Sequence, residues 1–142
     1  MAEEKTFRVK IVAPDRVFYE GEAEMLEMTT TEGDIGVLKG HIPLTAVIAP
    51  GVLAIHDTVG GNIRIAALHS GFVEILPDSV TVLAETVEWP EEIDINRANE
   101  ARIRAERRLQ ERPDGLNIAR AELALKKALV RAQSVEESNN KN

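Results

Sequence analysis

The chain has 142 residues, of which 44% are apolar, so it can form one core of ordinary size or one compact domain with an appendage. It contains no cysteine, which excludes disulfides, thiolate nucleophiles and cysteine-ligated zinc sites. The net charge of -7 argues against general nucleic-acid binding, because neutralising phosphates requires a basic surface.

Targeting and membrane signals are not recognisable in the sequence. No apolar run approaches the roughly 20 residues that a helix needs to cross a bilayer. Residues 1–5 (MAEEK) lack the apolar region of a secretory signal. We therefore expect a cytosolic protein.

The two halves of the chain differ in charge. Residues 1–90 hold 6 Lys and Arg against 14 Asp and Glu, a net charge of -8. Residues 93–133 hold 10 against 6, a net charge of +4. The sequence therefore predicts two electrostatically different bodies.

The first half has the pattern of short β-strands. Phe7, Val9 and Ile11 alternate with polar residues, which is the period of a half-buried strand. Further strand candidates are residues 16–19, 23–30, 44–49, 52–56, 62–68, 72–76 and 79–84. Turn signals separate them at Pro14-Asp15, Pro50-Gly51, Gly60-Gly61, Ser70-Gly71 and Pro77-Asp78. Short strands without intervening helices predict an antiparallel β-sandwich over residues 1–88.

Residues 32–44 (EGDIGVLKGHIPL) combine three glycines and a proline with interleaved apolar residues. We expect an ordered loop whose apolar residues pack underneath and whose Asp34, Lys39 and His41 are exposed. Two interpretations remain open at this point. The segment is either a plain turn between strands or a contact surface for another molecule.

The second half, after Pro90, has the pattern of helices. Residues 93–112 contain no Gly or Pro and many strong helix formers, and Asp94 is placed to cap the helix. Pro113-Asp114-Gly115 breaks this helix, and Asn117 is placed to cap a second one that ends near Gln133.

Each predicted helix carries one apolar stripe. The stripes are Ala98, Ala101, Ala105 and Leu109 on the first helix, and Ile118, Ala121, Leu125, Ala128, Leu129 and Ala132 on the second. They predict an antiparallel helical hairpin over residues 89–135, followed by a flexible polar tail over 136–142. A buried Ala contributes far less than a buried Leu or Ile, so the hairpin is weakly packed and can be moved. The fold class is thus α+β, with a sandwich followed by a hairpin.

A catalytic or metal site finds little support in the sequence. His41, His56 and His69 lie 15 and 13 positions apart, without the close spacing typical of a zinc site. The stretch His69-Ser70-Gly71 lacks the first glycine of a nucleophile elbow, so we interpret it as a turn. No glycine-rich phosphate loop is present. We therefore expect a protein that is not an enzyme and needs no metal.

The hairpin carries clustered cations. Arg97, Arg104 and Arg108 fall on one side of the first helix, and Lys127 and Arg131 lie one turn apart on the second. Such a set can hold a polyphosphate between the helices or meet an acidic protein surface. A plain solvated helix face is the third interpretation.

Residues 33–44 (GDIGVLKGHIPL) resemble the G-E-[LI]-G-[IV]-L-x-G-H-x-P-L signature of bacterial F-type ATP synthase epsilon subunits, in the delta/epsilon family. Residues 69–74 (HSGFVE) and 80–85 (VTVLAE) resemble the second signature stretch of that family. The resemblance covers residues 6 to about 133. It implies a non-catalytic rotor subunit at the foot of the central stalk, on the cytoplasmic face of the bacterial plasma membrane.

The resemblance also implies partners. The sandwich would bind the gamma subunit and the membrane-embedded c-ring, and would couple them in ion-driven ATP synthesis. The loop of Glu32, Asp34, Lys39 and His41 would form the c-ring contact. The chain departs from the common pattern at Asp34, which is usually Glu, and at Lys39, which is often Pro.

Residues 93–98 (IDINRA) match the I-D-x-x-R-A motif of epsilon subunits that bind ATP in a folded hairpin. The resemblance implies that the ATP contacts are Glu88, Ile93, Asp94, Arg97, Ala98, Arg104, Lys127 and Arg131. Lys127 stands where tight binders have Arg, which keeps the charge but loses a planar fork for phosphate. We therefore expect weaker ATP binding than in the tightest binders.

The mechanism that the resemblance implies uses ATP as a regulator and needs no other cofactor. The folded hairpin would permit ATP hydrolysis, whereas an extended hairpin would reach the catalytic beta and alpha subunits and block rotation. ATP shifts this equilibrium only as far as its affinities for the two forms differ. Two other hypotheses are a free-standing nucleotide-sensing module without a rotor and a small hydrolase built on the sandwich.

Overall fold

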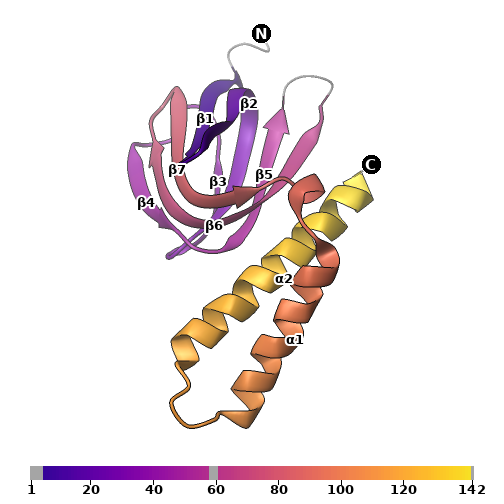
Figure 1. Ribbon diagram of the computed structural model, residues 1–142. Coiled ribbons are helices and arrows are strands. Elements are labelled where there is room, and N and C mark those ends of the chain that lie inside the picture. The colour runs from indigo at the N-terminus through magenta and orange to yellow at the C-terminus, as the bar shows by residue number, and fades with distance from the viewer. Residues whose placement is uncertain (1–4, 58–60, 142) are drawn as a thin grey trace.

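A computed structural model describes residues 5–57 and 61–141 of the chain. The strands gather at one end, and two antiparallel helices lie side by side and project away from them (Figure 1). Gly60 of the predicted Gly60-Gly61 turn and Asn142 of the predicted tail lie outside the described residues. The fold is the expected sandwich followed by a helical hairpin.

The sandwich consists of one seven-stranded sheet that curls round a core. Its strands are β1 (Phe7–Ala13), β2 (Arg16–Thr30), β3 (Gly33–Val37), β4 (Leu44–Ile48), β5 (Gly51–Asp57), β6 (Ile63–Ile75) and β7 (Ser79–Glu88). The order is β1-β7-β6-β4-β2-β3, with β5 paired to β2 and β6, and β1 paired to β2 as well. The β1–β7 pair is parallel, and the other pairs are antiparallel.

The core follows from the alternation of apolar residues along the strands. Phe7, Val9 and Ile11 of β1 are buried while the residues between them are exposed, as the period predicts. They pack in one cluster with Leu26 of β2 and Leu53 of β5. The hairpin is attached to the domain that contains this core.

Residues 33–37, which we expected to be part of a loop, form strand β3. The strand pairs with residues 26–30 of β2, and Val37 is buried in the core. The tight turn before it depends on Gly33, whose φ of 121° is unfavourable for other residues, and on Thr30, whose Oγ1 donates to the Gly33 carbonyl. Three glycines therefore indicated a loop where one of them closes a hairpin.

The predicted turn at Ser70-Gly71 is wrong, because β6 continues through it. Leu68 lies opposite Val87 and Ser70 opposite Thr86, so His69 is an extra residue on β6. This is a β-bulge. Gly71 has a φ of 141°, and a Cβ there would overlap the carbonyl oxygen of Leu83. The glycine signals a close approach between strands and not a chain reversal.

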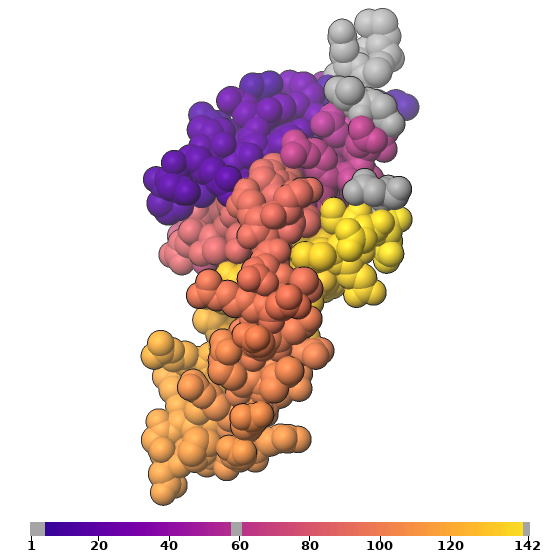
Figure 2. All heavy atoms as spheres, turned by 45° about the vertical axis from the view of Figure 1, so that its right-hand side comes forward, coloured from indigo at the N-terminus to yellow at the C-terminus, as the bar shows by residue number. Residues whose placement is uncertain are grey.

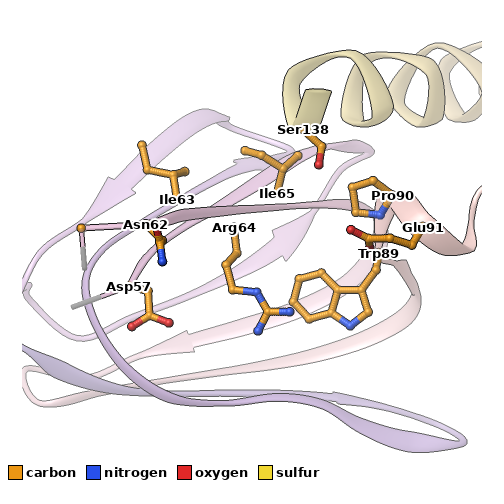
Figure 3. A pocket seen from close by; sticks show the side chains of 10 residues that line it. Asp57, Asn62, Ile63, Arg64, Ile65, Trp89, Pro90, Glu91 and Ser138 are labelled. Atoms are coloured by element: carbon orange, nitrogen blue, oxygen red, sulfur yellow. The ribbon is translucent and has the colours of Figure 1, made fainter. Parts of the chain in front are cut away.

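The connection from the sandwich to the hairpin is clamped by aromatic and charged side chains. Trp89 stacks on Phe18 with ring centroids 4.1 Å apart, and the Arg64 guanidinium lies 4.1 Å from the centre of the Trp89 ring (Figure 3). The 3-10 turn η2 (Pro90–Glu92) follows, and Glu92 accepts a hydrogen bond of 2.6 Å from Arg16. A pocket of about 530 Å³ opens beside Arg64 and Trp89.

The hairpin consists of α1 (Ile95–Glu111) and α2 (Ile118–Lys141). Both predicted caps are confirmed. Asp94 accepts a hydrogen bond of 3.1 Å from the Arg97 amide, and Asn117 accepts one of 3.1 Å from the Arg120 amide.

The stripes of the two helices meet through alanine. Ala98 and Ala105 of α1 and Ala121 and Ala128 of α2 are buried. Ile118 and Leu129 were also expected on the α2 stripe, but both are exposed, and Val130 and Ser134 are buried instead. The reason is that α2 packs on two neighbours, α1 on one side and strands β5 and β6 on the other.

The expected end of the second helix near Gln133 is also wrong, because α2 continues to Lys141. No Gly or Pro interrupts residues 134–141. Ser138 and Asn140 lie beside Ile63 and Ile65 of β6, so the last turns of α2 cover the sandwich. Figure 2 shows the same end of α2 against the sandwich, and the rest of the hairpin projecting away from it.

Candidate functional site

A pocket of about 440 Å³ lies between the end of β7, the start of α1 and the middle of α2. It contains seven of the eight residues that the resemblance assigned to ATP: Glu88, Ile93, Asp94, Arg97, Ala98, Arg104 and Arg131. Glu92 and Ala101 also line it, and the sequence did not indicate them. Lys127 is half-buried on α2 and is not among the lining residues.

Local structure explains why these side chains converge. Asp94 caps α1, so Arg97 lies in the first turn of that helix and Arg104 two turns later on the same side. The buried Ala98 allows α2 to approach closely, which brings Arg131 to the pocket. Glu88 is the last residue of β7 and reaches the pocket from the sandwich.

Glu88 joins the sandwich to α2. Its Oε1 accepts hydrogen bonds from Nε of Arg131 at 2.8 Å and from Nε2 of His69 at 2.9 Å. Burial alone would raise the pKa of the Glu88 carboxyl, but the hydrogen bonds from His69 and Arg131 outweigh burial and hold that pKa below its ordinary value of 4.5. Glu88 is therefore ionised at neutral pH.

The free donors of the pocket are guanidinium groups. Glu88 is paired with Arg131, Glu92 with Arg16, and Asp94 with the α1 N-terminus. In the part of the chain that the structure describes, no ion pair engages Arg97 or Arg104. The pocket can therefore accept an anion with several oxygen atoms.

The basic groove continues toward the tip of the hairpin. A second pocket of about 540 Å³ lies between the helices and shares Ala101 and Arg104 with the first. Arg108 and Arg120 also line it. Arg97, Arg104 and Arg108, which the sequence placed on one side of α1, thus all line these two pockets.

The residues assigned to a ring contact are divided by strand β3. Glu32 and Asp34 lie at its start, where Asp34 accepts a hydrogen bond of 2.8 Å from Thr29. Lys39 and His41 follow its end, and Nδ1 of His41 is 2.6 Å from the Ile42 carbonyl oxygen. Five residues of strand span roughly 16 Å, so the four side chains form two groups and not one.

Apolar side chains accompany the second group. Leu38 and Ile42, which we expected to pack underneath the loop, are instead exposed beside Lys39 and His41. Gly40 donates a backbone hydrogen bond of 2.8 Å to the Pro77 carbonyl. The segment 38–42 is therefore fastened to the β6–β7 turn. We call it the 38–42 loop.

An exposed apolar row crosses the outer face of the sheet. Val47, Phe72 and Leu83 lie side by side on β4, β6 and β7, and Leu83 lies opposite Val12, which lies opposite Val17. Val17, Val47, Phe72 and Leu83 are 46% to 55% exposed. An apolar surface of this kind is typical of an interaction site. The sequence did not indicate it, because strand pairing, not spacing, brings these residues together.

Neither a cluster of metal ligands nor a membrane-spanning helix is found among the described residues. Across residues 5–57 and 61–141, no three or more His, Asp or Glu side chains are placed to hold a metal ion. Neither α1 nor α2, over its described length, is long and apolar enough to cross a membrane.

Comparison with known proteins identifies relatives over nearly the whole chain. Residues 6–90 match the family model "ATP synthase, Delta/Epsilon chain, beta-sandwich domain", and residues 91–136 match "ATP synthase, Delta/Epsilon chain, long alpha-helix domain". The ATP synthase epsilon chain of Caldanaerobacter subterraneus is 46% identical over 129 residues, which are 90% of this chain and 92% of that one. That of Bacillus cytotoxicus is 46% identical over 127 residues, 89% of this chain and 94% of that one.

A solved structure shows the same fold at lower identity. A chain in the cryo-EM structure of the Euglena gracilis mitochondrial ATP synthase (OSCP/F1/c-ring in rotational state 1) aligns with a TM-score of 0.79 and 23% identity. The alignment covers 95% of this chain and 82% of that chain.

Proposed function

The chain belongs to the ATP synthase delta/epsilon family, and we propose that it is the epsilon subunit that couples gamma to the c-ring and restrains ATP hydrolysis. It is a non-catalytic part of the complex, held at the cytoplasmic face of the bacterial plasma membrane through its partners. The observation that carries the regulatory part is the pocket between hairpin and sandwich that gathers Glu88, Arg97, Arg104 and Arg131.

The exposed apolar surfaces support the rotor role. The row that includes Val47, Phe72 and Leu83 is a flat apolar surface suited to a permanent protein partner, and we assign gamma to it. The 38–42 loop combines exposed Leu38 and Ile42 with Lys39 and His41, and we assign the c-ring to it. Glu32 and Asp34, at the opposite end of β3, would lie at the edge of this contact.

ATP regulation follows from the charge of the pocket. The phosphates of ATP would lie against Arg97, Arg104 and Arg131, which come from both helices of the hairpin. ATP would therefore hold α1, α2 and β7 together and favour the folded hairpin. Without ATP, the hairpin would extend, and its basic surface would reach acidic segments of the catalytic beta and alpha subunits.

The magnitudes are compatible with such a switch. The two helices pack on each other through alanines, each worth about 0.8 kcal/mol per methyl group, so little apolar burial opposes the separation of α1 from α2. A ligand that binds only the folded form at about 100 times its Kd stabilises that form by about 2.7 kcal/mol. ATP that binds only the folded form would therefore shift the balance toward it.

The test is a distance measurement. Because the chain has no cysteine, cysteines introduced at exposed Lys10 and Gln110 can carry a pair of spectroscopic labels, one on the sandwich and one near the hairpin tip. ATP should shift the distance distribution toward the folded form, and Arg104→Ala should abolish the shift. Arg107→Ala is the matched control, because Arg107 is exposed on α1 but lines neither pocket between the helices. An undiminished shift in Arg104→Ala would refute the assigned site.

Co-purification separates the rotor role from the free-standing module. A rotor subunit should be recovered with gamma and the c-ring, and Phe72→Asp should reduce that recovery because it places a charge in the apolar row. Recovery of the chain alone from membranes that contain the complex would favour the free-standing module.

A further inference from the structure

His69 has a feature that the proposed function does not yet use. It is the extra residue of the β6 bulge, and its side chain is fully buried between the sandwich and α2. Bulges redirect side chains, and this one turns His69 toward Glu88, which lies 19 residues later on β7. Sequence spacing gave no indication of this contact.

His69 and Arg131 both donate a hydrogen bond to Glu88, which links the sandwich to α2. An ionised carboxylate only accepts hydrogen bonds, so Nε2 of His69 is the donor to Oε1, and Nε of Arg131 donates to the same atom. Glu88 thus contacts Arg131 at Nε. The four remaining N–H groups of the guanidinium are on its terminal nitrogens, at the side that can face the pocket.

The other nitrogen of His69 is unsatisfied. Nδ1 is buried and has no hydrogen-bond partner within the described residues. An unpaired buried polar atom costs free energy, and an apolar side chain at this position would avoid that cost. Packing alone therefore does not explain a histidine here, whereas its Nε2 hydrogen bond to Glu88 does.

We propose that His69 is a positioning residue, which fixes Glu88 so that Glu88 holds Arg131 by Nε and presents its terminal nitrogens to a phosphate group of a bound nucleotide. The proposal rests on the nucleotide site proposed above and adds a residue that lines no part of that pocket. Without His69, Glu88 is free to rotate and pair with the guanidinium fork of Arg131 or with Arg97. Either pairing occupies donors that the phosphates need.

Two amide variants of His69 differ only in reach. Gln carries its amide nitrogen at about the place of Nε2 and can still donate to Glu88, whereas the shorter Asn cannot. We expect His69→Asn and His69→Leu to weaken ATP binding about five- to tenfold in isothermal titration calorimetry of the full chain. His69→Gln should stay within about twofold of the unchanged protein. His56→Leu is the matched control, because His56 contacts Glu27 at 2.6 Å in the same way but outside this pocket.

A double-mutant cycle tests whether His69 acts through Arg131. In an Arg131→Lys background, which lacks Nε–H and the planar fork, His69→Asn should change the Kd of ATP by less than about twofold. Equal losses with and without Arg131, or equal losses in His69→Asn and His69→Gln, would overturn the proposal. Failure of the unchanged protein to bind ATP would overturn both the nucleotide site and the role of His69. Normal ATP binding with an additive cycle would overturn the role of His69 alone.

Discussion

The sandwich and the hairpin are stabilised by different kinds of contact. The sandwich buries large side chains from facing strands, such as Phe7, Leu26 and Leu53, whereas α1 and α2 meet through alanines. A fully buried Leu or Phe contributes about 1.5–3 kcal/mol, several times the contribution of an alanine methyl group. The sandwich therefore holds most of the apolar core, and the hairpin depends more on what it is docked against.

The hairpin is itself unequal along its length. The C-terminal part of α2 contacts the sandwich through buried Val130 and Ser134 and through the ion pair of Arg131 with Glu88. The tip, near residues 112–117, projects away from the strands (Figure 1). Movement of the hairpin must therefore break a small, defined set of contacts at one end of α2.

The largest expected effect is a loss of stability when a buried leucine of the sandwich is truncated. Leu53→Ala should lower the free energy of unfolding by about 2–5 kcal/mol in urea denaturation, because it leaves a cavity among fully buried residues. Leu123→Ala, at an exposed position of α2, is the control and should lower the free energy of unfolding by less than about 0.5 kcal/mol. Similar losses in the two variants would mean that the loss in Leu53→Ala does not come from its burial in the core of the sandwich.

A smaller effect should release the hairpin alone. Ala128 is 1% exposed between α2 and its neighbours, so Ala128→Leu should overpack the contact at a cost of about 1–3 kcal/mol. Hydrogen exchange should then speed up in α1 and α2 while β1, β6 and β7 stay protected. Ala119→Leu, at an exposed position of α2, should leave exchange unchanged. Faster exchange throughout the strands would contradict an independent sandwich.

The smallest expected effect is on the docking of α2 through the hydrogen bonds to Glu88, and it depends on pH. The pKa of Glu88 is lower in the folded protein than its ordinary value of 4.5, so its stabilising contribution is present above that value and is lost as pH falls through the folded pKa. Glu88→Gln should destabilise docking of α2 by about 1 kcal/mol at pH 7. The difference from the unchanged protein should shrink as pH falls below 4.5 and the Glu88 carboxylate becomes protonated. A difference that persists in acid would show that the charge of Glu88 is not the stabilising feature.

Sequence periodicity predicted the features that depend on local chemistry. The alternation in β1, the caps Asp94 and Asn117 and the break at Gly115 each involve residues close together in the chain. The candidate site was placed by the resemblance to a family, half of it by the motif at residues 93–98, and the structure brings seven of its eight residues to one pocket. Lys127 is the exception, because it does not line the pocket although it is one turn from Arg131.

The features that sequence reasoning missed depend on pairing between distant segments. Strand β3 was hidden by three glycines, of which Gly33 closes a hairpin, and the bulge at His69 is visible only in the register of β6 against β7. Val130 and Ser134 were missed because a single stripe was assigned to a helix that has two neighbours. Single-helix periodicity cannot describe a helix that packs on both sides.

Trp89, which stacks on Phe18 and lies under Arg64, can report on the boundary between sandwich and hairpin by fluorescence. The chain has one tryptophan, so its intrinsic fluorescence comes from the boundary between sandwich and hairpin. A hairpin that swings about Ile93 leaves this stack intact and the emission of Trp89 nearly constant. One that peels away from the end of β7 exposes the indole to water and shifts the emission to longer wavelength. The emission wavelength of Trp89 therefore distinguishes the two hinge positions without an added label.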